Sequence, residues 1–304
     1  MTEKTVPIFS KRALAPAKVN LFLHVGPPAD DGYHPICSLM AFADVGDIVA
    51  TYEADALSLS VHGPFARALA GEGDNLVLTA ARALIAEARR PVAPVGLSLE
   101  KRLPVASGLG GGSSDAGATL RLLRRVLELP IDNDRLQAVA ASLGADGAAC
   151  LWGAPVLAEG RGEKLSAAPG LPLVDAVLVN PGVAVATAEV YRRFDADGRF
   201  GDVAPPASPD AFEDIAELAA WLAGQRNDLE AAAIATAPQV GAVLETLAGE
   251  PEALLARVSG SGGTCFALCA SDIEAESLAE RIEALAPDWW VQRCRLGGPW
   301  PDPA

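Results

Sequence analysis

The chain has 304 residues, half of them apolar, and its 24 Lys and Arg against 39 Asp and Glu give a formal net charge of −15. At roughly 100–200 residues per domain, this length predicts two domains with a sizeable core. A surface this acidic repels polyanions, which argues against general binding of nucleic acid or of anionic membranes.

The five cysteines are scattered, form no CxxC motif, and stand beside only three histidines in the whole chain. This pattern is typical of reduced, mostly buried thiols in a cytosolic protein rather than of disulfides or a zinc site. The N-terminus has no apolar core of a signal peptide, and no run of about 18 apolar residues predicts a membrane span. We therefore expect a cytoplasmic protein, as a monomer or a homodimer.

In the first half of the chain, alternating residues predict a half-buried strand over 12–25, with Lys18 on its polar face. Asp74 and Asn75 offer an N-cap for an Ala-rich helix that reaches about residue 90. Further strands are expected at 36–42, 48–52, 57–61 and 95–101, and further helices at 113–128 and 132–143.

In the second half, we expect a short β segment at 155–165 and strands at 174–179 and 290–296, with another strand pair flanking 259–263. Helices are expected near 211–223, 229–247 and 273–285, and a surface loop at 201–210. Strands and helices mixed in this order favour an α+β architecture. A change in composition places the domain boundary near residue 168, which gives domains of residues 1–168 and 169–304.

A glycine-rich segment, PVASGLGGGSSD, runs from Pro104 to Asp115 between a predicted strand and a predicted helix. Glycine lets the backbone approach a ligand closely, Ser113 or Ser114 can cap the helix, and free N–H groups at a helix N-terminus bind anions. We therefore expect a phosphate chain to bind here. The loop lacks the Lys of a Walker A motif, and a Ser stands where a dinucleotide fingerprint needs its last glycine. A flexible linker is the remaining alternative, which the flanking strand and helix argue against.

The same segment resembles the phosphate loop of the GHMP kinases. Further motifs resemble that family in the same order along residues 12–296: PAKVNL at 16–21, DGYH at 31–34, DNL at 74–76, LGAD at 143–146, NPG at 180–182, NDLE at 227–230 and SGSGG at 259–263. The triple glycine before Ser-Ser-Asp resembles the same segment in one branch of this family, the branch whose substrate is a cytidine diphosphate-linked methylerythritol. The resemblance implies a two-domain GHMP kinase fold with mixed and antiparallel sheets, and with the ATP and substrate sites in the cleft between the domains.

The activity implied by the resemblance is transfer of phosphate from ATP, with Mg²⁺, to the 2-hydroxyl of that small molecule. The implied ATP-binding residues are Asn75, Pro104, Val105, Ala106, Ser107, Gly108, Leu109, Gly110, Gly111, Gly112, Ser113 and Ser114. The metal ligands stay unassigned, with Ser113 and Ser114 as candidates.

Two residues are the catalytic candidates. By resemblance, Asp146 is the general base that accepts the proton of the acceptor hydroxyl. Lys18 is a lone cation in an apolar strand, where burial is costly unless the charge is paired. Pairing with Asp146 would keep that carboxylate ionised and oriented. Alternatively, Asp146 is a solvated loop residue or a cap, and Lys18 extends to water from an edge strand.

The implied substrate-binding residues are Asn20, Tyr33, His34, Thr187 and Tyr191. Aromatic faces stack on a base, and an imidazole or backbone group reads its polar edge. Each of these residues has an alternative role. Tyr33 and His34 could anchor their loop, Tyr191 could be a packed residue on a helix, and Thr187 could cap that helix. By resemblance, the second glycine loop at 259–263 closes on the phosphate side, although it could also be a simple hairpin turn.

Two departures from the family pattern stand out. Gly147-Ala148-Ala149 follow Asp146 where the family usually has Val-Pro-Phe, and Ala106-Ser107 stand where glycines are common. The residues after Asp146 are the only hint of one alternative hypothesis, an ATP-binding relative without catalysis. Another is a kinase with a different acceptor, such as homoserine or a sugar, which would share the ATP loop and differ in the substrate loop at Tyr33 and His34.

Overall fold

The computed structural model describes residues 11–70 and 75–303, so Asp74 of the predicted N-cap lies outside the described part. Its strands are β1 (Arg12–Val25), β2 (Ile36–Tyr52), β3 (Ser58–His62), β4 (Gly96–Glu100), β5 (Val156–Gly160), β6 (Lys164–Ala167), β7 (Val174–Asn180), β8 (Leu255–Val258), β9 (Cys265–Cys269) and β10 (Trp290–Gly297). Its α-helices are α1 (Leu76–Glu87), α2 (Gly111–Val126), α3 (Asn133–Ser142), α4 (Gly147–Trp152), α5 (Thr187–Asp197), α6 (Ile215–Ala223), α7 (Glu230–Thr236), α8 (Pro238–Ala248) and α9 (Asp272–Leu285). The predicted α+β class and mixed sheet are confirmed.

Strand β2 organises the sheet of ten strands that these residues form. It pairs with β1 along one edge and with β5, β10 and β4 in turn along the other, always antiparallel. The order β3-β4-β2-β10-β7-β9-β8 includes one parallel pair, β3 with β4.

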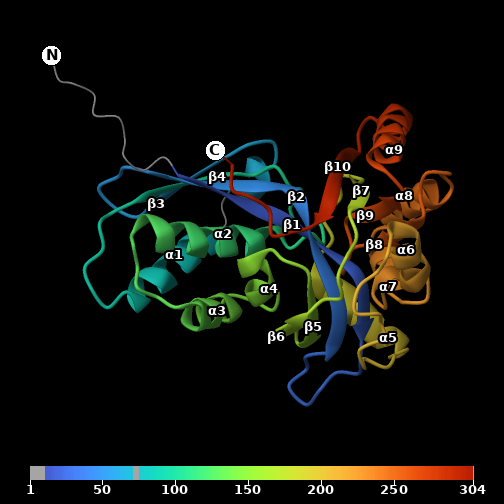
Figure 1. Ribbon diagram of the computed structural model, residues 1–304, viewed down its shortest axis with the longest axis horizontal. Coiled ribbons are helices and arrows are strands. Elements are labelled where there is room, and N and C mark those ends of the chain that lie inside the picture. Colours follow the sequence, from blue (N-terminus) through green and yellow to red (C-terminus); the bar gives the residue numbers. More distant parts are fainter. Residues whose placement is uncertain (1–10, 71–74, 304) are drawn as a thin grey trace.

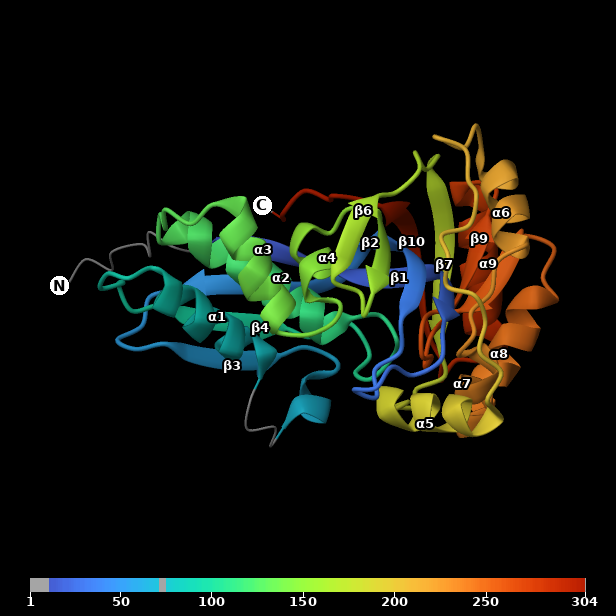
Figure 2. The ribbon, with the colours of Figure 1, turned by 90° about the horizontal axis from the view of Figure 1, so that it is seen from below.

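Helices cover the two halves of this sheet separately. Figure 1 shows α1 to α4 on one side of β1 to β4, and α5 to α9 gathered around β7 to β10. Figure 2 shows the same division from below. Strand β10 joins the halves because it pairs with β7 along its length and with β2 at Leu296 and Gly297. The segment after β10 returns to the first half, where Trp300 Nε1 donates to the Phe42 carbonyl and Asp302 accepts from Leu14 N–H.

The first strand is more buried than its alternation predicts. Residues 13–25 are all buried, so the expectation of a half-buried strand is wrong. Helix α2 packs against β1, and apolar β1 residues such as Phe22 share a core cluster with Val174 and Phe266 of the second half. A β-bulge between Asn20 and Phe22 also interrupts the strict alternation.

Four other predicted elements differ in extent. The strands expected at 36–42 and 48–52 are one strand, β2, because Asp47 is buried in an ion pair with Lys101 instead of lying in a loop. The helix expected over 229–247 is two helices, because Pro238 lacks the N–H that would continue α7. The β segment at 155–165 is a hairpin of β5 and β6.

All five cysteines are buried free thiols, and burial raises the pKa of Cys150 to about 12. Over the described ranges, no helix is both long and apolar enough to cross a bilayer.

Candidate active site

A cavity of about 1010 Å³ lies where β1, the N-terminal ends of α1, α2 and α5, and the glycine loop before β9 meet. Every predicted catalytic and substrate-binding residue lines it: Lys18, Asn20, Tyr33, His34, Asp146, Thr187 and Tyr191. The predicted ATP-binding residues that line it are Asn75, Pro104, Val105, Ala106, Ser107, Gly108, Gly110, Gly111, Gly112 and Ser113. Leu109 and Ser114 are instead buried, away from the cavity lining.

The predicted phosphate loop ends in a left-handed residue. Gly110 has φ of +63° and is the N-cap of α2, which begins at Gly111, two residues earlier than expected. The expectation that Ser113 or Ser114 caps this helix is therefore wrong: both lie within its first turn. Because no side chain caps α2, the first N–H groups of this 16-residue helix are available to an anion in the cavity.

The two glycine loops pack directly against each other. A Cβ at Gly108, where φ is +76°, would lie 2.4 Å from the Ser259 carbonyl oxygen and 2.5 Å from that of Gly262. A Cβ at Gly263 would lie 2.8 Å from Ser107 Cα. Only glycines allow this approach, which holds the first loop in place from behind.

We expect Gly108→Ala to raise KM for ATP at least tenfold and to lower the melting temperature, because the added methyl group separates the two loops. Gly198→Ala is the matched control, since Gly198 has φ of +64° but nothing within 4 Å of the added Cβ. It should cost about 1 kcal/mol of stability from the backbone alone and leave KM unchanged. Steady-state kinetics and thermal unfolding separate the two effects, and an equal KM in both variants would contradict the packing argument.

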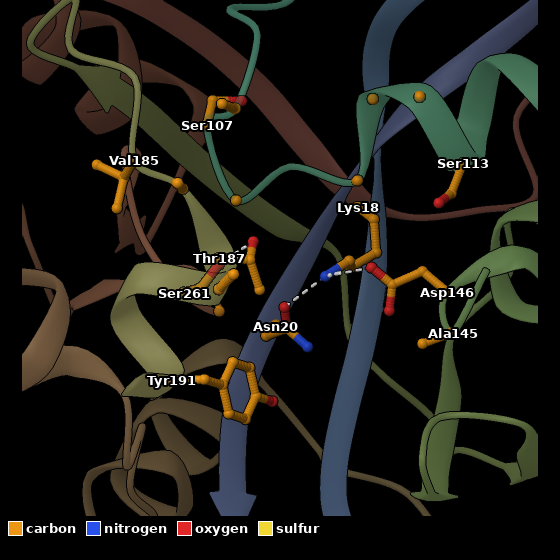
Figure 3. A pocket seen from close by; sticks show the side chains of 18 of the residues that line it. Lys18, Asn20, Ser107, Ser113, Ala145, Asp146, Val185, Thr187, Tyr191 and Ser261 are labelled. Carbon is orange, nitrogen blue, oxygen red and sulfur yellow. Dashed lines mark hydrogen bonds and ion pairs between the residues drawn. The ribbon is translucent and has the colours of Figure 1, made fainter. Parts of the chain in front are cut away.

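Lys18 and Asp146 form the ion pair that the sequence predicted. Lys18 Nζ lies 3.2 Å from Asp146 Oδ2 and donates to Asn20 Oδ1 at 2.6 Å, so the buried ammonium does not extend to water. Figure 3 shows it between the two side chains. Asp146 occupies the N-cap position of α4 but makes no side-chain cap bond, which leaves its carboxylate directed into the cavity.

Helix α4, which the sequence did not predict, accounts for one departure from the family pattern. Gly147, Ala148 and Ala149 form its first turn and are buried. A Cβ at Gly147 would lie 2.0 Å from the Ala140 carbonyl oxygen of α3. The small residues therefore let α4 pack closely on α3 and present Asp146 at its start.

Aromatic rings gather at the far end of the cavity. His34 is buried, with Nδ1 2.8 Å from the Gly26 carbonyl oxygen and Nε2 3.0 Å from Asp195. The Tyr191 ring centroid lies 5.1 Å from that of His34, and burial raises the Tyr191 pKa to about 12, so it stays neutral. Tyr33 is exposed, and Arg161, which also pairs with Asp31, lies 4.4 Å above its ring. Tyr33, His34 and Tyr191 all line the cavity. The part of the cavity that they line, called the aromatic recess below, offers ring faces to a planar group.

Thr187 is the first residue of α5 rather than its cap, so the expected capping role is wrong. Ala186 holds the N-cap position, and Thr187 Oγ1 lies 2.9 Å from Ser261 Oγ of the second glycine loop. Asn75 does cap α1, because its side chain accepts from Val77 N–H.

A buried triad below the phosphate loop was not predicted. Lys101 Nζ lies 2.5 Å from Asp47 Oδ2 and 2.8 Å from Asp115 Oδ2, and Asp47 Oδ1 accepts from Arg102 and Leu103 N–H. The triad thus joins β2 to both ends of the loop. Lys101 at the end of an expected strand and Asp115 after the serines were the available signals, but Asp47 falls between the strands expected at 36–42 and 48–52. Arg161, Arg192 and Asp195 also line the cavity, without a sequence pattern that indicates it.

We expect the stability of the protein to depend on Asp115 between about pH 4 and pH 8. Burial raises the Asp115 pKa from 3.8 to about 8, and its Oδ1 has no hydrogen-bond partner among the described residues. The folded state then binds a proton that the unfolded state releases, so this contribution is complete below pH 3.8 and is lost as pH rises through about 8. Urea unfolding of wild type and Asp115→Asn should show wild type losing stability relative to the variant from pH 5 to pH 8. If the free energies of unfolding of wild type and Asp115→Asn changed with pH in parallel, the raised pKa of Asp115 would be contradicted.

The chain is similar to known proteins over most of its length. The family model of the GHMP kinases N terminal domain matches residues 75–154, and that of the GHMP kinases C terminal matches residues 209–288. The chain is 61% identical to the 4-diphosphocytidyl-2-C-methyl-D-erythritol kinase of Caulobacter sp. (strain K31) over 95% of this chain and 99% of the relative. It is 50% identical to the enzyme of that name from Hyphomonas neptunium, over 93% and 95% of the two chains.

A crystal structure of 4-(cytidine 5'-diphospho)-2C-methyl-D-erythritol kinase matches with a TM-score of 0.74 and 33% identity, covering 94% of this chain and 99% of that one. A homoserine kinase from Cytophaga hutchinsonii matches with a TM-score of 0.67 at 18% identity, covering 98% and 96%, which shows a shared fold alone.

Proposed function

Because the chain belongs to the GHMP kinase family, we infer that it is an ATP-dependent kinase that phosphorylates the 2-hydroxyl of 4-diphosphocytidyl-2-C-methyl-D-erythritol. This reaction belongs to non-mevalonate isoprenoid precursor biosynthesis. The observation that carries the inference is the position of the Lys18–Asp146 pair in one cavity with both the phosphate loop and the aromatic recess. The similar relatives named for this activity favour it over homoserine, a sugar or a catalytically silent relative.

In the proposed mechanism, Asp146 accepts the proton of the 2-hydroxyl as that oxygen attacks the γ-phosphorus and ADP leaves. Lys18 holds the carboxylate in place and ionised, and it neutralises charge near the transferring group. The N–H groups at the start of α2 hold the phosphate oxygens. Positioning and charge neutralisation dominate such a transfer, because the protein forms no covalent intermediate.

The residues present fit ATP, because the glycines leave a cradle without side chains before an uncapped helix N-terminus. We propose that Mg²⁺ enters with ATP. The described residues hold no group of three or more His, Cys, Asp or Glu that could bind a metal on its own, and Mg²⁺ with nucleotides commonly keeps phosphate and water ligands. Ser113 is the candidate hydroxyl beside it, since Ser114 does not line the cavity.

We further propose the domains of residues 1–168 and 169–304, with the cavity in the cleft between them. Residue 168 falls between β6 and β7, and residues from both sides of it line the cavity. We propose that the enzyme acts in the cytoplasm, as a monomer or a homodimer. Its buried free thiols suit a reducing compartment.

An ADP-release assay with ATP and Mg²⁺ tests the function, with the cytidine compound, homoserine, mevalonate and galactose as separate acceptors. We expect turnover with the cytidine compound only. Turnover with another acceptor would keep the kinase activity and overturn the substrate.

We expect Tyr33→Ala to raise KM for the cytidine compound about fivefold to a hundredfold, because stacking on a base contributes about 1–3 kcal/mol. KM for ATP should stay within twofold, since Tyr33 packs under Arg161 and belongs to neither glycine loop. Tyr52→Ala, which removes another exposed tyrosine that does not line the cavity, is the matched control. An unchanged KM for the cytidine compound would contradict the role of Tyr33.

A further inference from the structure

The side-chain amide of Asn20 has two different partners inside the protein. Its Oδ1 accepts from Lys18 Nζ at 2.6 Å, and its Nδ2 donates to Ser38 Oγ at 2.7 Å. All three residues are buried, and Ser38 is fully enclosed on β2. An amide has nearly the same shape when rotated by 180°, so its partners alone decide which end faces Lys18.

The hydroxyl of Ser38 selects one of these two orientations. Ser38 Oγ lies 2.6 Å from the Phe22 carbonyl oxygen, which can only accept, so the single hydroxyl proton points there. Toward Asn20, Ser38 can therefore only accept, and it must meet the NH₂ end of the amide. The oxygen of Asn20 is left facing Lys18.

The backbone of Asn20 is held separately. Its N–H donates to Ser259 Oγ at 3.2 Å, and Ser259 Oγ also bonds the Gly108 carbonyl of the phosphate loop at 3.2 Å. With the backbone fixed, rotation of the amide is the remaining freedom, and Ser38 limits it from the side opposite Lys18, whose ammonium can only donate and so favours the same orientation.

The reversed amide would place NH₂ against the Lys18 ammonium, a donor against a donor. Lys18 would lose one of its two side-chain acceptors, and its ammonium would no longer be held between Asn20 and Asp146 (Figure 3). Ser38 itself does not line the cavity. We propose that Ser38 is a positioning residue for phosphoryl transfer, which orients the Asn20 amide and thereby directs Lys18 toward Asp146. The proposal rests on the proposed function.

The test compares Ser38→Thr with Ser38→Val, two variants of equal shape that differ only in the hydroxyl. We expect kcat of the Val variant to be about fivefold to a hundredfold below that of the Thr variant, because the Asn20 NH₂ group becomes a buried donor without a partner and no longer holds the amide in one orientation. KM for ATP should agree within twofold between them. Equal kcat values, or a difference confined to KM, would overturn the proposal.

The Asn20→Asp background supplies a second comparison. A carboxylate offers Lys18 an oxygen in either orientation, so Thr and Val at position 38 should there differ less than threefold in kcat. A full-sized difference in this background would show that Ser38 acts by another route and would overturn the proposal.

A measurement without turnover keeps this inference separate from the proposed function. In the NMR spectrum of wild type, the Asn20 side-chain amide protons, assigned by their loss in Asn20→Asp, should show contacts to the Ser38 β protons and none to the Lys18 ε protons. Contacts to Lys18 would overturn the assigned orientation even if the protein were inactive with the cytidine compound. Absent turnover with the expected orientation would overturn the function and leave the amide geometry standing.

Discussion

Replacing Asp146 by Asn is expected to lower kcat about 10²–10⁴-fold, the usual contribution of a general base. The amide keeps the shape of the carboxylate but cannot accept the hydroxyl proton, and it removes the charge that Lys18 pairs with at 3.2 Å. KM for ATP should change little, because the phosphate loop and the N-terminus of α2 are untouched. Burst and steady-state kinetics with the cytidine compound measure both values.

Asp195→Asn is the matched control for this substitution. Asp195 also lines the cavity, but it pairs with His34 in the aromatic recess instead of with Lys18. Its loss should affect KM for the cytidine compound more than kcat. A kcat for Asp146→Asn within threefold of wild type would assign proton acceptance to another group.

Lys101→Met is expected to destabilise the protein by about 3–5 kcal/mol, because removing one partner of a buried ion pair leaves the remaining charge uncompensated. Asp47 is completely buried and would keep only its backbone donors at Arg102 and Leu103. Because the triad joins both ends of the phosphate loop to β2, KM for ATP should rise as well. Urea unfolding gives the stability change.

Lys164→Met provides the comparison, since Lys164 is an exposed lysine on the β6 strand. Exposed substitutions usually change stability by less than about 0.5 kcal/mol. If both variants lost equally little stability, the triad would not support the loop in the way described.

Local patterns in the sequence predicted most elements, because caps, glycines and apolar periods act over a few residues. The helix beginning at Leu76 and the strand 12–25 are examples. The features that could not be predicted from the sequence depend on residues that are distant in the chain. Asp47 lies inside a strand because Lys101 compensates its charge from 54 residues away. Residue 147 at the start of α4 has to be glycine because a Cβ there would lie 2.0 Å from the Ala140 carbonyl oxygen of α3.

In the candidate site, too, some residues could be predicted from the sequence, whereas others depend on partners that are distant in the sequence. Lys18 and Asp146 could be paired from the sequence because a buried cation needs a partner and the family resemblance supplied one. Ser38 could not be predicted, because its importance comes from a hydroxyl proton directed by the Phe22 carbonyl across the β1–β2 ladder. The caps proposed for Ser113 and Thr187 failed because Gly110 and Ala186 take those positions.

The strand that joins the halves has a consequence for protein synthesis. Residues 290–297 insert between β2 and β7, and Trp300 and Asp302 then attach to Phe42 and Leu14. While a ribosome is still translating residue 250, the nascent chain already contains Lys18, Asp146 and the first glycine loop, but not β10, the strand that pairs with both β2 and β7. The second glycine loop, whose Gly260 and Ser261 line the cavity, and β10 are both synthesised after residue 250. A prematurely terminated chain would therefore carry the catalytic pair without the strand that joins the two halves of the sheet.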